Sequence, residues 1–212
     1  MNIYNVIILD ESGSMSSIYR KAITSMNEVL GGIRKNQETY PDQRHFVTIV
    51  TFEGNGMDGV KLRRDRVPVD TVEPFTERDY NPGGCTPLYD AMGKTLTDLE
   101  ALIHEDDKVM ATVITDGMEN SSQEYSGRII KNLVSRLRGK GWALAYIGAN
   151  QNSVEVAHDL NISNALNYDT TPEGMDEMSF RCKKAFTRMA DMLFCKMDVG
   201  LVDDLFDTSN ED

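Results

Sequence analysis

Short apolar runs of strand length alternate with longer amphipathic stretches along most of the chain. Continuous apolar runs, typical of strands buried on both faces, occupy residues 3–9, 46–52, 109–115, 142–147 and 165–168. Apolar residues at three- and four-residue spacing predict helices over residues 15–37, 87–103, 125–138, 153–160 and 172–195. Strands separated by helices of this length need right-handed crossovers. We therefore expect an α/β fold whose mostly parallel sheet has helices on both faces.

A weaker strand is predicted over residues 60–67, and it follows the strand 46–52 without a helix between them. We expect these two strands to form an antiparallel hairpin at one edge of the sheet. Residues 61–66 also hold the only basic cluster of the sequence, KLRRDR. Charged side chains on an edge strand discourage pairing with another sheet, which explains the cluster without a binding role.

Polar residues follow two of the predicted buried strands at the point where each strand ends. Asp10 comes directly after the strand 3–9, with Ser12 and Ser14 at two-residue spacing behind it, and Asp116 comes directly after the strand 109–115. Between them, a glycine-rich loop brings Thr86 to the start of a helix. Ligands of doubly wound sheets bind beyond the carboxyl ends of the strands. If the two strands are neighbours, these five side chains meet at one point.

Two carboxylates and three hydroxyls form an all-oxygen set, which suits a hard cation such as Mg²⁺. If the carboxylates act through water, the direct ligands are neutral hydroxyls. The ion then stays electrophilic and leaves one position open to a carboxylate from outside. This pattern predicts a site that binds an acidic side chain of a partner.

The five residues and their order resemble the von Willebrand factor A (vWA) family and its metal-ion-dependent adhesion site (MIDAS). Asp10, Ser12 and Ser14 match the family's D-x-S-x-S motif, Thr86 in GCTPLYDA matches its threonine loop, and Asp116 in TDG matches its last element. The resemblance extends from residue 3 to about residue 195. It implies a Rossmann-like, doubly wound three-layer sandwich with six strands in the order 3-2-1-4-5-6 and strand 3 antiparallel at the edge.

The resemblance also implies roles for the residues of the site. Ser12, Ser14 and, in the ligand-bound state, Thr86 would touch the metal, while Asp10 and Asp116 would act through water. The ion would be Mg²⁺, with Mn²⁺ or Ca²⁺ as alternatives. A rim around it would select the partner, and we expect this rim to consist of Glu11, Tyr80, Asn81, Glu119 and Asn120.

More narrowly, the chain is similar to compact intracellular vWA proteins of bacteria, including those found beside tellurite-resistance and kinase–phosphatase stress systems. The function implied is a non-enzymatic, metal-dependent protein-interaction module whose partner protein supplies Asp or Glu to the ion. The alternative is a metal-dependent phosphoester hydrolase. That chemistry uses a second acid two residues after the first, where this chain has Ser12.

Each part of the motif also has an explanation in local structure alone. Asp10 with Ser12 and Ser14 suits a helix N-cap. Thr86 before a proline and Asp116 before a glycine suit a cap and a turn. The metal site is favoured because all three parts fall at strand ends in the expected order.

The net charge and the cysteine content limit the classes of partner and the cellular compartment that we expect. The net charge of −12 argues against nucleic acid and against an anionic membrane surface as partners. No apolar run approaches the ~20 residues that span a bilayer, and no signal peptide is visible. The three cysteines cannot all pair, and free thiols indicate a reducing, cytoplasmic setting.

The predicted domain organisation is a vWA domain over residues 1–197 followed by an acidic C-terminal tail over residues 198–212. Acidic residues dominate the tail, and we expect it to be mobile and solvated. A second hypothesis is that the segment 201–207, which has acids flanked by apolar residues, docks on a metal site.

Overall fold

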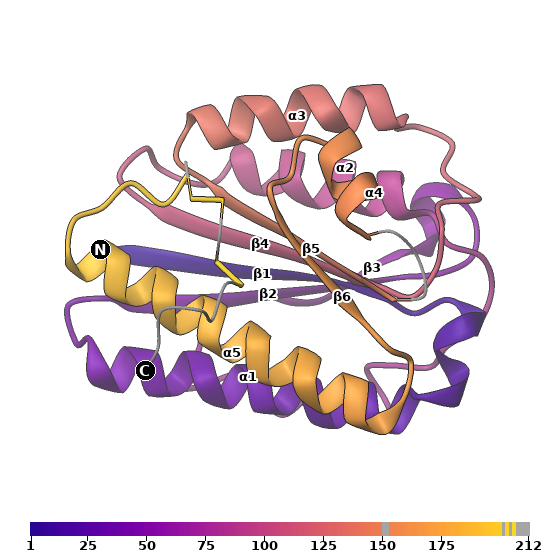
Figure 1. The fold of residues 1–212 in the computed structure, drawn as a ribbon, viewed down its shortest axis with the longest axis horizontal. Coiled ribbons are helices and arrows are strands. Elements are labelled where there is room, and N and C mark those ends of the chain that lie inside the picture. Colours follow the sequence, from indigo (N-terminus) through magenta and orange to yellow (C-terminus); the bar gives the residue numbers. More distant parts are fainter. Residues whose placement is uncertain (150–152, 201, 204, 207–212) are drawn as a thin grey trace.

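The strands of the structure, a computed structural model, are β1 (Asn2–Asp10), β2 (Arg44–Phe52), β3 (Val60–Pro68), β4 (Lys108–Thr115), β5 (Ala143–Ala149) and β6 (Asn164–Tyr168). The structure describes residues 1–149, 153–200, 202–203 and 205–206. Within this part of the chain, the strands form one sheet in the order β3-β2-β1-β4-β5-β6 (Figure 1). Every neighbouring pair is parallel except β2 with β3. The predicted strand order and the antiparallel edge strand are therefore confirmed.

Helices cover both faces of the sheet, and this explains the continuous apolar runs of its central strands. On one face lie α1 (Tyr19–Thr39) and α5 (Pro172–Phe194), and on the other lie α2 (Leu88–Glu100), α3 (Gly127–Gly139) and α4 (Ser153–Asp159) (Figure 1). Each face has its own hydrophobic core. Because β1 is buried from Asn5 to Asp10, both faces of that strand need apolar side chains. No helix in the described part of the chain has the length and apolar content to cross a membrane.

The edge strand β3 carries the basic cluster, as predicted. Its side chains are half-buried or exposed along its whole length, in contrast to the central strands. Arg64 pairs with Asp79 at 2.8 Å, and Arg66 pairs with its neighbour Asp65 at 2.8 Å. These pairs place charged groups along the open edge of the sheet, where they oppose edge-to-edge association.

The first helix begins later than the sequence indicates. A short 3-10 turn at Gly13–Ser17 precedes α1, which starts at Tyr19. The side chain of Met15 in this turn is buried, which is why it continues the apolar pattern of the helix. The turn gives Ser12 and Ser14 a conformation that regular helix would not give them.

Part of the acidic tail packs on the domain, contrary to the expectation of a mobile, solvated segment. Val199, Leu205 and Phe206 are 1%, 2% and 6% exposed. The backbone N–H of Leu205 donates to Asn164 Oδ1 at 2.9 Å, and Arg181 donates to the carbonyl of Phe206 at 3.0 Å. Burial of these apolar side chains outweighs the solvation of the acids between them.

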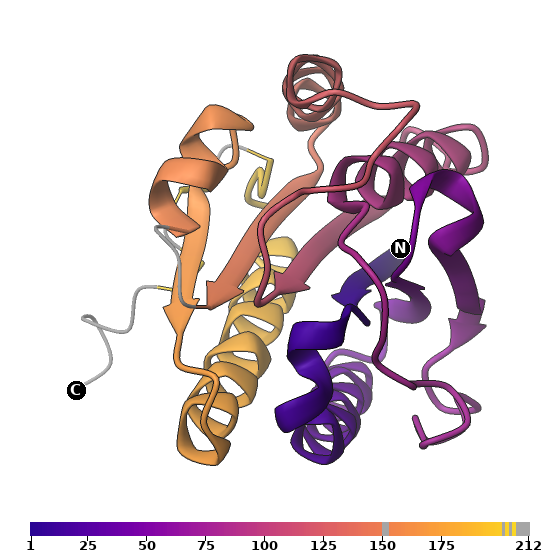
Figure 2. The same ribbon diagram turned by 90° about the vertical axis from the view of Figure 1, so that its right-hand side faces the viewer.

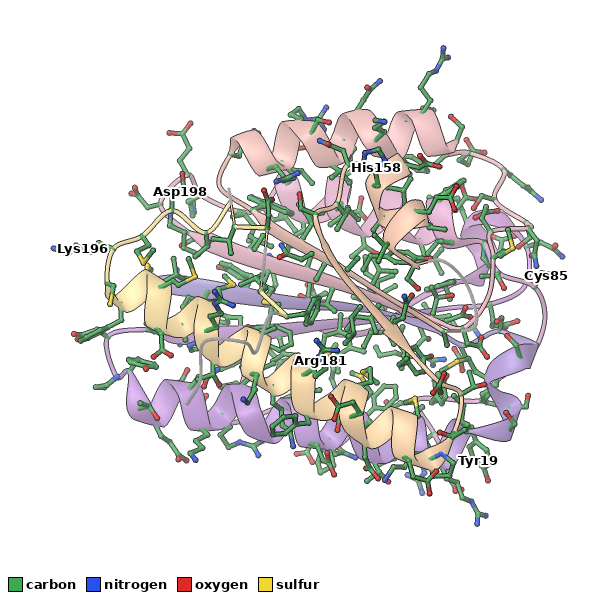
Figure 3. All side chains as sticks on the ribbon, viewed as in Figure 1. Tyr19, Cys85, His158, Arg181, Lys196 and Asp198 are labelled. Carbon is green, nitrogen blue, oxygen red and sulfur yellow. The ribbon has the colours of Figure 1, made fainter. Side chains whose placement is uncertain are left out.

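This contact lies at the end of the sheet away from the predicted site, because Asn164 opens β6. Figure 3 shows the same separation, with Asp198 at one end of the molecule and Cys85 at the other. The described residues of the segment 201–207 are therefore remote from the loops of Asp10, Thr86 and Asp116 in their own chain. Leu201, Asp204 and Asp207 lie outside the described residues.

The strand register fixes where the polar residues meet. β1 and β4 are adjacent, with Leu9 beside Ile114, so both strands end at the same edge of the sheet. Asp10 and Asp116 follow directly at this edge. Figure 2 looks onto this carboxyl end, where the 3-10 turn lies in front of β1.

Candidate metal centre

Asp10 is the buried anchor of the candidate site. Its side chain is fully buried. One carboxylate oxygen accepts the backbone N–H of Ser12 at 2.7 Å, and the other accepts the hydroxyl of Thr115 at 2.5 Å. The hydroxyl of Tyr80 donates to the Asp10 carbonyl at 2.6 Å. The bonds from Ser12 and Thr115 hold the carboxylate in one orientation, and the bond from Tyr80 holds the backbone of Asp10.

Ser12, Ser14 and Asp116 form a chain of oxygen atoms beside Asp10. The hydroxyl oxygens of Ser12 and Ser14 lie 3.1 Å apart, and Ser14 donates to the Asp116 carboxylate at 2.6 Å. Ser12 is buried, whereas Ser14 is exposed. This row of side-chain oxygens thus extends from a buried hydroxyl to an exposed one.

Thr86, in the glycine-rich loop, lies close to the same oxygen atoms. The surroundings of Gly117 show this. A Cβ atom placed on Gly117 would lie 3.1 Å from Thr86 Oγ1, 3.6 Å from Asp10 Oδ2 and 3.7 Å from Ser14 Oγ. Oxygens from two loops, the one after β1 and the glycine-rich loop, therefore surround a small cradle at Gly117 in a third loop, and a side chain there would crowd Thr86. The structure brings together all five residues that the sequence predicts as metal ligands. Their binding of a metal stays a prediction.

The electrostatics of the site favour a cation. Burial raises the pKa of Asp10 to about 6, against the lowering effect of the hydrogen bonds from Thr115 and Ser12, and the nearby Asp116 charge adds to the rise. Burial also raises the pKa of Asp116. Two neighbouring carboxyls with raised pKa values indicate negative charge that the surroundings leave uncompensated, and a divalent ion would neutralise it.

The donor set suits Mg²⁺ better than softer ions, because every donor atom is oxygen. Among the described residues, no group of three or more His, Cys, Asp or Glu side chains could hold a metal ion. The candidate site in this part of the chain is the mixed carboxylate–hydroxyl cradle.

Two of the five predicted rim residues are buried, and the prediction that they face a partner is wrong. Glu11 is 0% exposed and its carboxylate pairs with Arg63 at 2.9 Å. Tyr80 is 1% exposed and its hydroxyl is used by Asp10. Both side chains support the loops from inside, because each finds a polar partner in the fold that the sequence does not reveal.

Glu119 is half-buried, and its carboxylate is also engaged within the protein. It accepts the backbone N–H groups of Tyr89, Ser121 and Ser122 at 2.9, 2.8 and 2.7 Å and the Ser122 hydroxyl at 2.7 Å. Asn120 is exposed and pairs with Thr86 in both directions: its side chain accepts the Thr86 N–H at 2.8 Å, and its own N–H donates to the Thr86 carbonyl at 3.2 Å.

Of the predicted rim residues, only Asn81 and Asn120 are therefore exposed. Two exposed side chains beside the site were not predicted as rim. Met118 is 72% exposed, two residues after Asp116, and Cys85 is exposed next to Thr86 (Figure 3). A methionine in a sequence usually indicates packing in the core, so the only signal for exposure here is that Met118 lies in the loop after β4.

Sequence reasoning also missed Asp90 and Thr115, which hold the loops in place. The buried Asp90 carboxylate accepts the backbone N–H groups of Gln123, Glu124 and Tyr125 at 2.8, 3.0 and 2.8 Å. This ties the first turn of α2 to the loop after β4. Thr115 also accepts the N–H of Gly117 at 3.1 Å, which shapes the turn below the cradle.

Comparison with known proteins shows the fold. No protein-family model matches the sequence, and no curated protein matches it. Among solved structures, the pilus adhesin SpaC from Lactobacillus rhamnosus GG has a TM-score of 0.67 at 12% identity, over 88% of this chain and 30% of the adhesin. A von Willebrand factor type A protein from Catenulispora acidiphila has a TM-score of 0.59 at 14% identity, over 87% of this chain and 42% of the other.

The PilB minor pilin from Streptococcus sanguinis has a TM-score of 0.61 at 13% identity, over 92% of this chain and 63% of the pilin. This chain thus spans less than two thirds of each of these proteins. At such identities the likeness concerns the fold alone. The fold is that of von Willebrand factor A-like proteins, as the sequence predicts.

Proposed function

We propose that this chain is a metal-dependent protein-interaction module. It binds a divalent cation, preferably Mg²⁺, at Asp10, Ser12, Ser14, Thr86 and Asp116, and captures an acidic residue of a partner protein. When bound, the ion supplies an electrophilic position for that carboxylate. The observation that carries the proposal is the cradle at Gly117, where three oxygens from two other loops lie within 3.7 Å of one point.

The hydrogen bonds of the cradle support binding in preference to turnover. Asp10 is fully buried, and both its carboxylate oxygens accept hydrogen bonds within the protein. Such a carboxylate is suited to orient water or neighbouring hydroxyls and is poorly placed to attack a phosphoester. The fold neighbours include a pilus adhesin and a minor pilin, which agrees with an interaction role without assigning one.

The exposed rim indicates the kind of partner. Asn81, Asn120, Met118 and Cys85 are uncharged and surround a site of high negative charge. A partner would place its acid on the ion and neutral or apolar neighbours on this rim. The net charge of −12 opposes long-range attraction of an acidic partner, so recognition depends on short-range coordination.

A reducing, cytoplasmic setting is part of the proposal. All three cysteines are free, and Cys85 and Cys195 are exposed. Exposed free thiols are typical of proteins in a reducing compartment. The net charge of −12 makes nucleic acid and anionic membranes poor partners.

Isothermal titration calorimetry with MgCl₂ or MnCl₂ tests the metal site. The wild-type protein should bind one ion, and Asp116→Ala should abolish binding with its circular dichroism spectrum unchanged, because Asp116 lies at the rim and outside the core. Asp98→Ala is the matched control, since Asp98 is an exposed helical residue paired with Lys94. Unchanged metal affinity in Asp116→Ala would refute the assignment.

Two further measurements separate binding from catalysis. Wild-type protein and Asp10→Asn are assayed on generic phosphoesters with Mg²⁺ or Mn²⁺, and we expect no turnover from either. Turnover that the Asn variant loses would establish the hydrolase instead. Pull-downs with wild-type and Asp116→Ala protein, each with and without chelator, should then retain a partner only on the metal-loaded wild type.

A further inference from the structure

Glu11 occupies the position between two predicted metal residues, and its backbone joins two other elements there. Its N–H donates to the carbonyl of Phe52 at the end of β2 at 2.8 Å. Its carbonyl accepts the N–H of Gly83, in the glycine-rich loop that leads to Thr86, at 2.9 Å. Glu11, whose side chain does not face a partner, thus has a backbone that contacts both β2 and the glycine-rich loop.

The Glu11 side chain adds a second link to the same loop. Its Oε1 atom accepts the N–H of Asn81 at 2.6 Å. Next to these contacts, the N–H of Gly13 donates to the carbonyl of Gly84 at 3.1 Å. Hydrogen bonds at Glu11 and Gly13 therefore join the loop of Ser12 and Ser14 to the loop of Thr86.

Arg63 of the edge strand holds the Glu11 carboxylate from the other side. Its Nη2 atom donates to both carboxylate oxygens at 3.1 and 2.9 Å, and its Nε atom donates to Thr51 on β2 at 2.8 Å. Lys61 lies 3.8 Å from the same carboxylate. Donors from β3 and from the glycine loop therefore fix a fully buried carboxylate in one orientation.

Stability alone gives little reason for such a pair. The Glu11 carboxylate is removed from water while Arg63 stays partly exposed, and apolar residues in place of such a pair often stabilise a fold as well or better. The position of the ion pair gives a reason for it that stability does not. Glu11 belongs to the loop of Ser12 and Ser14, and its hydrogen bonds join that loop to the loop of Thr86.

We propose that the Glu11–Arg63 ion pair is a positioning device that sets the preference of the metal site for Mg²⁺ over Ca²⁺. The inference rests on the proposed metal site and names the selectivity of that same site. Mg²⁺ demands a near-ideal octahedron of oxygens at about 2.1 Å, whereas Ca²⁺ accepts longer bonds and flexible geometry at about 2.3–2.6 Å. Loops that are locked together before the ion arrives favour the small ion, and loops that can separate favour the large one.

Glu11→Gln tests the proposal with little change of shape. The amide oxygen can still accept the Asn81 N–H, but the amide nitrogen then faces the Arg63 guanidinium as a second donor. Mg²⁺ affinity should fall about tenfold, the lower end of the effect of disturbing groups around a bound metal, because Glu11 positions the loops and contacts no proposed ligand directly. Ca²⁺ affinity should fall by a smaller factor, so that the ratio of the two affinities drops.

Arg63→Met is the second variant, since it removes the counter-ion and keeps Glu11. It should lower the Mg²⁺ to Ca²⁺ affinity ratio in the same direction. Arg66→Gln is the matched control on the same strand, because Arg66 pairs with Asp65 on the surface. Titrations are run at a temperature where circular dichroism shows each metal-free variant to be folded.

The outcomes separate this inference from the function on which it rests. If the wild type binds neither ion, the proposed metal site fails. If the wild type binds but both variants keep their two affinities within twofold, Glu11 and Arg63 are not positioning residues. If both affinities fall by one common factor, the pair acts through charge or general stability, and the selectivity proposal is overturned.

Discussion

Gly117 matters at the scale of single residues because of the side chain it lacks. Its missing Cβ leaves open the point that lies 3.1 Å from Thr86 Oγ1 and 3.6 Å from Asp10 Oδ2. Its backbone dihedral angles lie outside the left-handed region, so alanine adds a methyl group without backbone strain. The residue therefore allows a test of the cradle that leaves all five predicted ligands in place.

Gly117→Ala should weaken Mg²⁺ binding at least about tenfold, the lower end of the effect of disturbing groups around a bound metal. The methyl group would crowd the hydroxyl of Thr86, one of the proposed ligands, and push it out of position. Gly31→Ala is the control, since nothing lies within 4 Å of its added Cβ. This helical substitution should leave Mg²⁺ affinity unchanged and raise stability by roughly 0.5–1 kcal/mol. Equal Mg²⁺ affinity in the two variants, measured by calorimetry, would remove the cradle from the proposed site.

At the scale of elements, the loops around the site are bound to one another more than to solvent. Asp90 and Glu119 hold the start of α2 against the loop after β4, and Glu11 holds the first loop against the glycine loop. Each of these carboxylates is conspicuous in the sequence as a charged residue near a predicted site. The fold uses them as internal acceptors of backbone N–H groups, which satisfies donors that strand and helix ends leave unpaired.

The C-terminal segment is a second element held by long-range contacts, and it packs at the opposite end of the sheet. Leu205→Ala should lower the free energy of unfolding by about 2 kcal/mol, the low end for a buried leucine. For a chain of this size that corresponds to roughly 4–8 °C in Tm. Mg²⁺ affinity should not change, because Leu205 bonds to the first residue of β6 and not to the carboxyl end. Leu62→Ala, at a side chain that is 60% exposed, is the control and should cost less than about 0.5 kcal/mol.

A Leu205→Ala protein that melts at the wild-type temperature would show that the segment contributes nothing to the fold. A protein that melts normally but binds Mg²⁺ or its partner differently would instead support docking of the segment on a metal site. The melting temperature and the Mg²⁺ affinity can both be measured on one preparation, by thermal denaturation and by calorimetry.

For the whole molecule, the site couples stability to pH. The folded state holds a proton on Asp10 up to about pH 6, whereas the ordinary pKa of this carboxyl is 3.8. Protonation therefore favours the metal-free folded state. This contribution is fully present below about pH 4 and is lost as pH rises through 6, a difference of about 3 kcal/mol at 1.36 kcal/mol per pKa unit.

Asp10→Asn isolates this effect from other carboxyls, such as Glu100, whose pKa is lowered by its hydrogen bond to Arg136 and which acts in the opposite direction. Without metal, the Asn variant should unfold at higher urea concentration than the wild type at pH 7, and the gap should close toward pH 4. Saturating Mg²⁺ should stabilise the wild type at pH 7 and not the variant. A gap between the two proteins that is the same at pH 4 and pH 7 would contradict the buried charge of Asp10.

The sequence by itself determined most strands and helices and the antiparallel edge pair, and its resemblance to a known family implied the strand order. It also indicated five residues that lie together at one edge of the sheet, and their binding of a metal stays a prediction. It could do so because these depend on patterns along the chain. Continuous apolar runs indicate strands that are covered on both faces. Separations of helix length require crossovers between parallel strands. A carboxylate that directly follows a parallel strand lies at the carboxyl-terminal edge of the sheet. The match of motif order to strand order then placed Asp10, Thr86 and Asp116 together before any coordinates.

Only the tertiary structure decided which charged residues around the cradle face solvent. Glu11 and Arg63 are 52 positions apart in the chain, and they meet because β3 folds back along β2 at the edge of the sheet. Leu205 and Phe206 belong to an acidic stretch, yet they are buried because α5 and β6 present an apolar surface to them. The burial of a charged or apolar side chain depends on what lies across from it, and that partner is supplied by long-range packing, which leaves no period or spacing in the sequence.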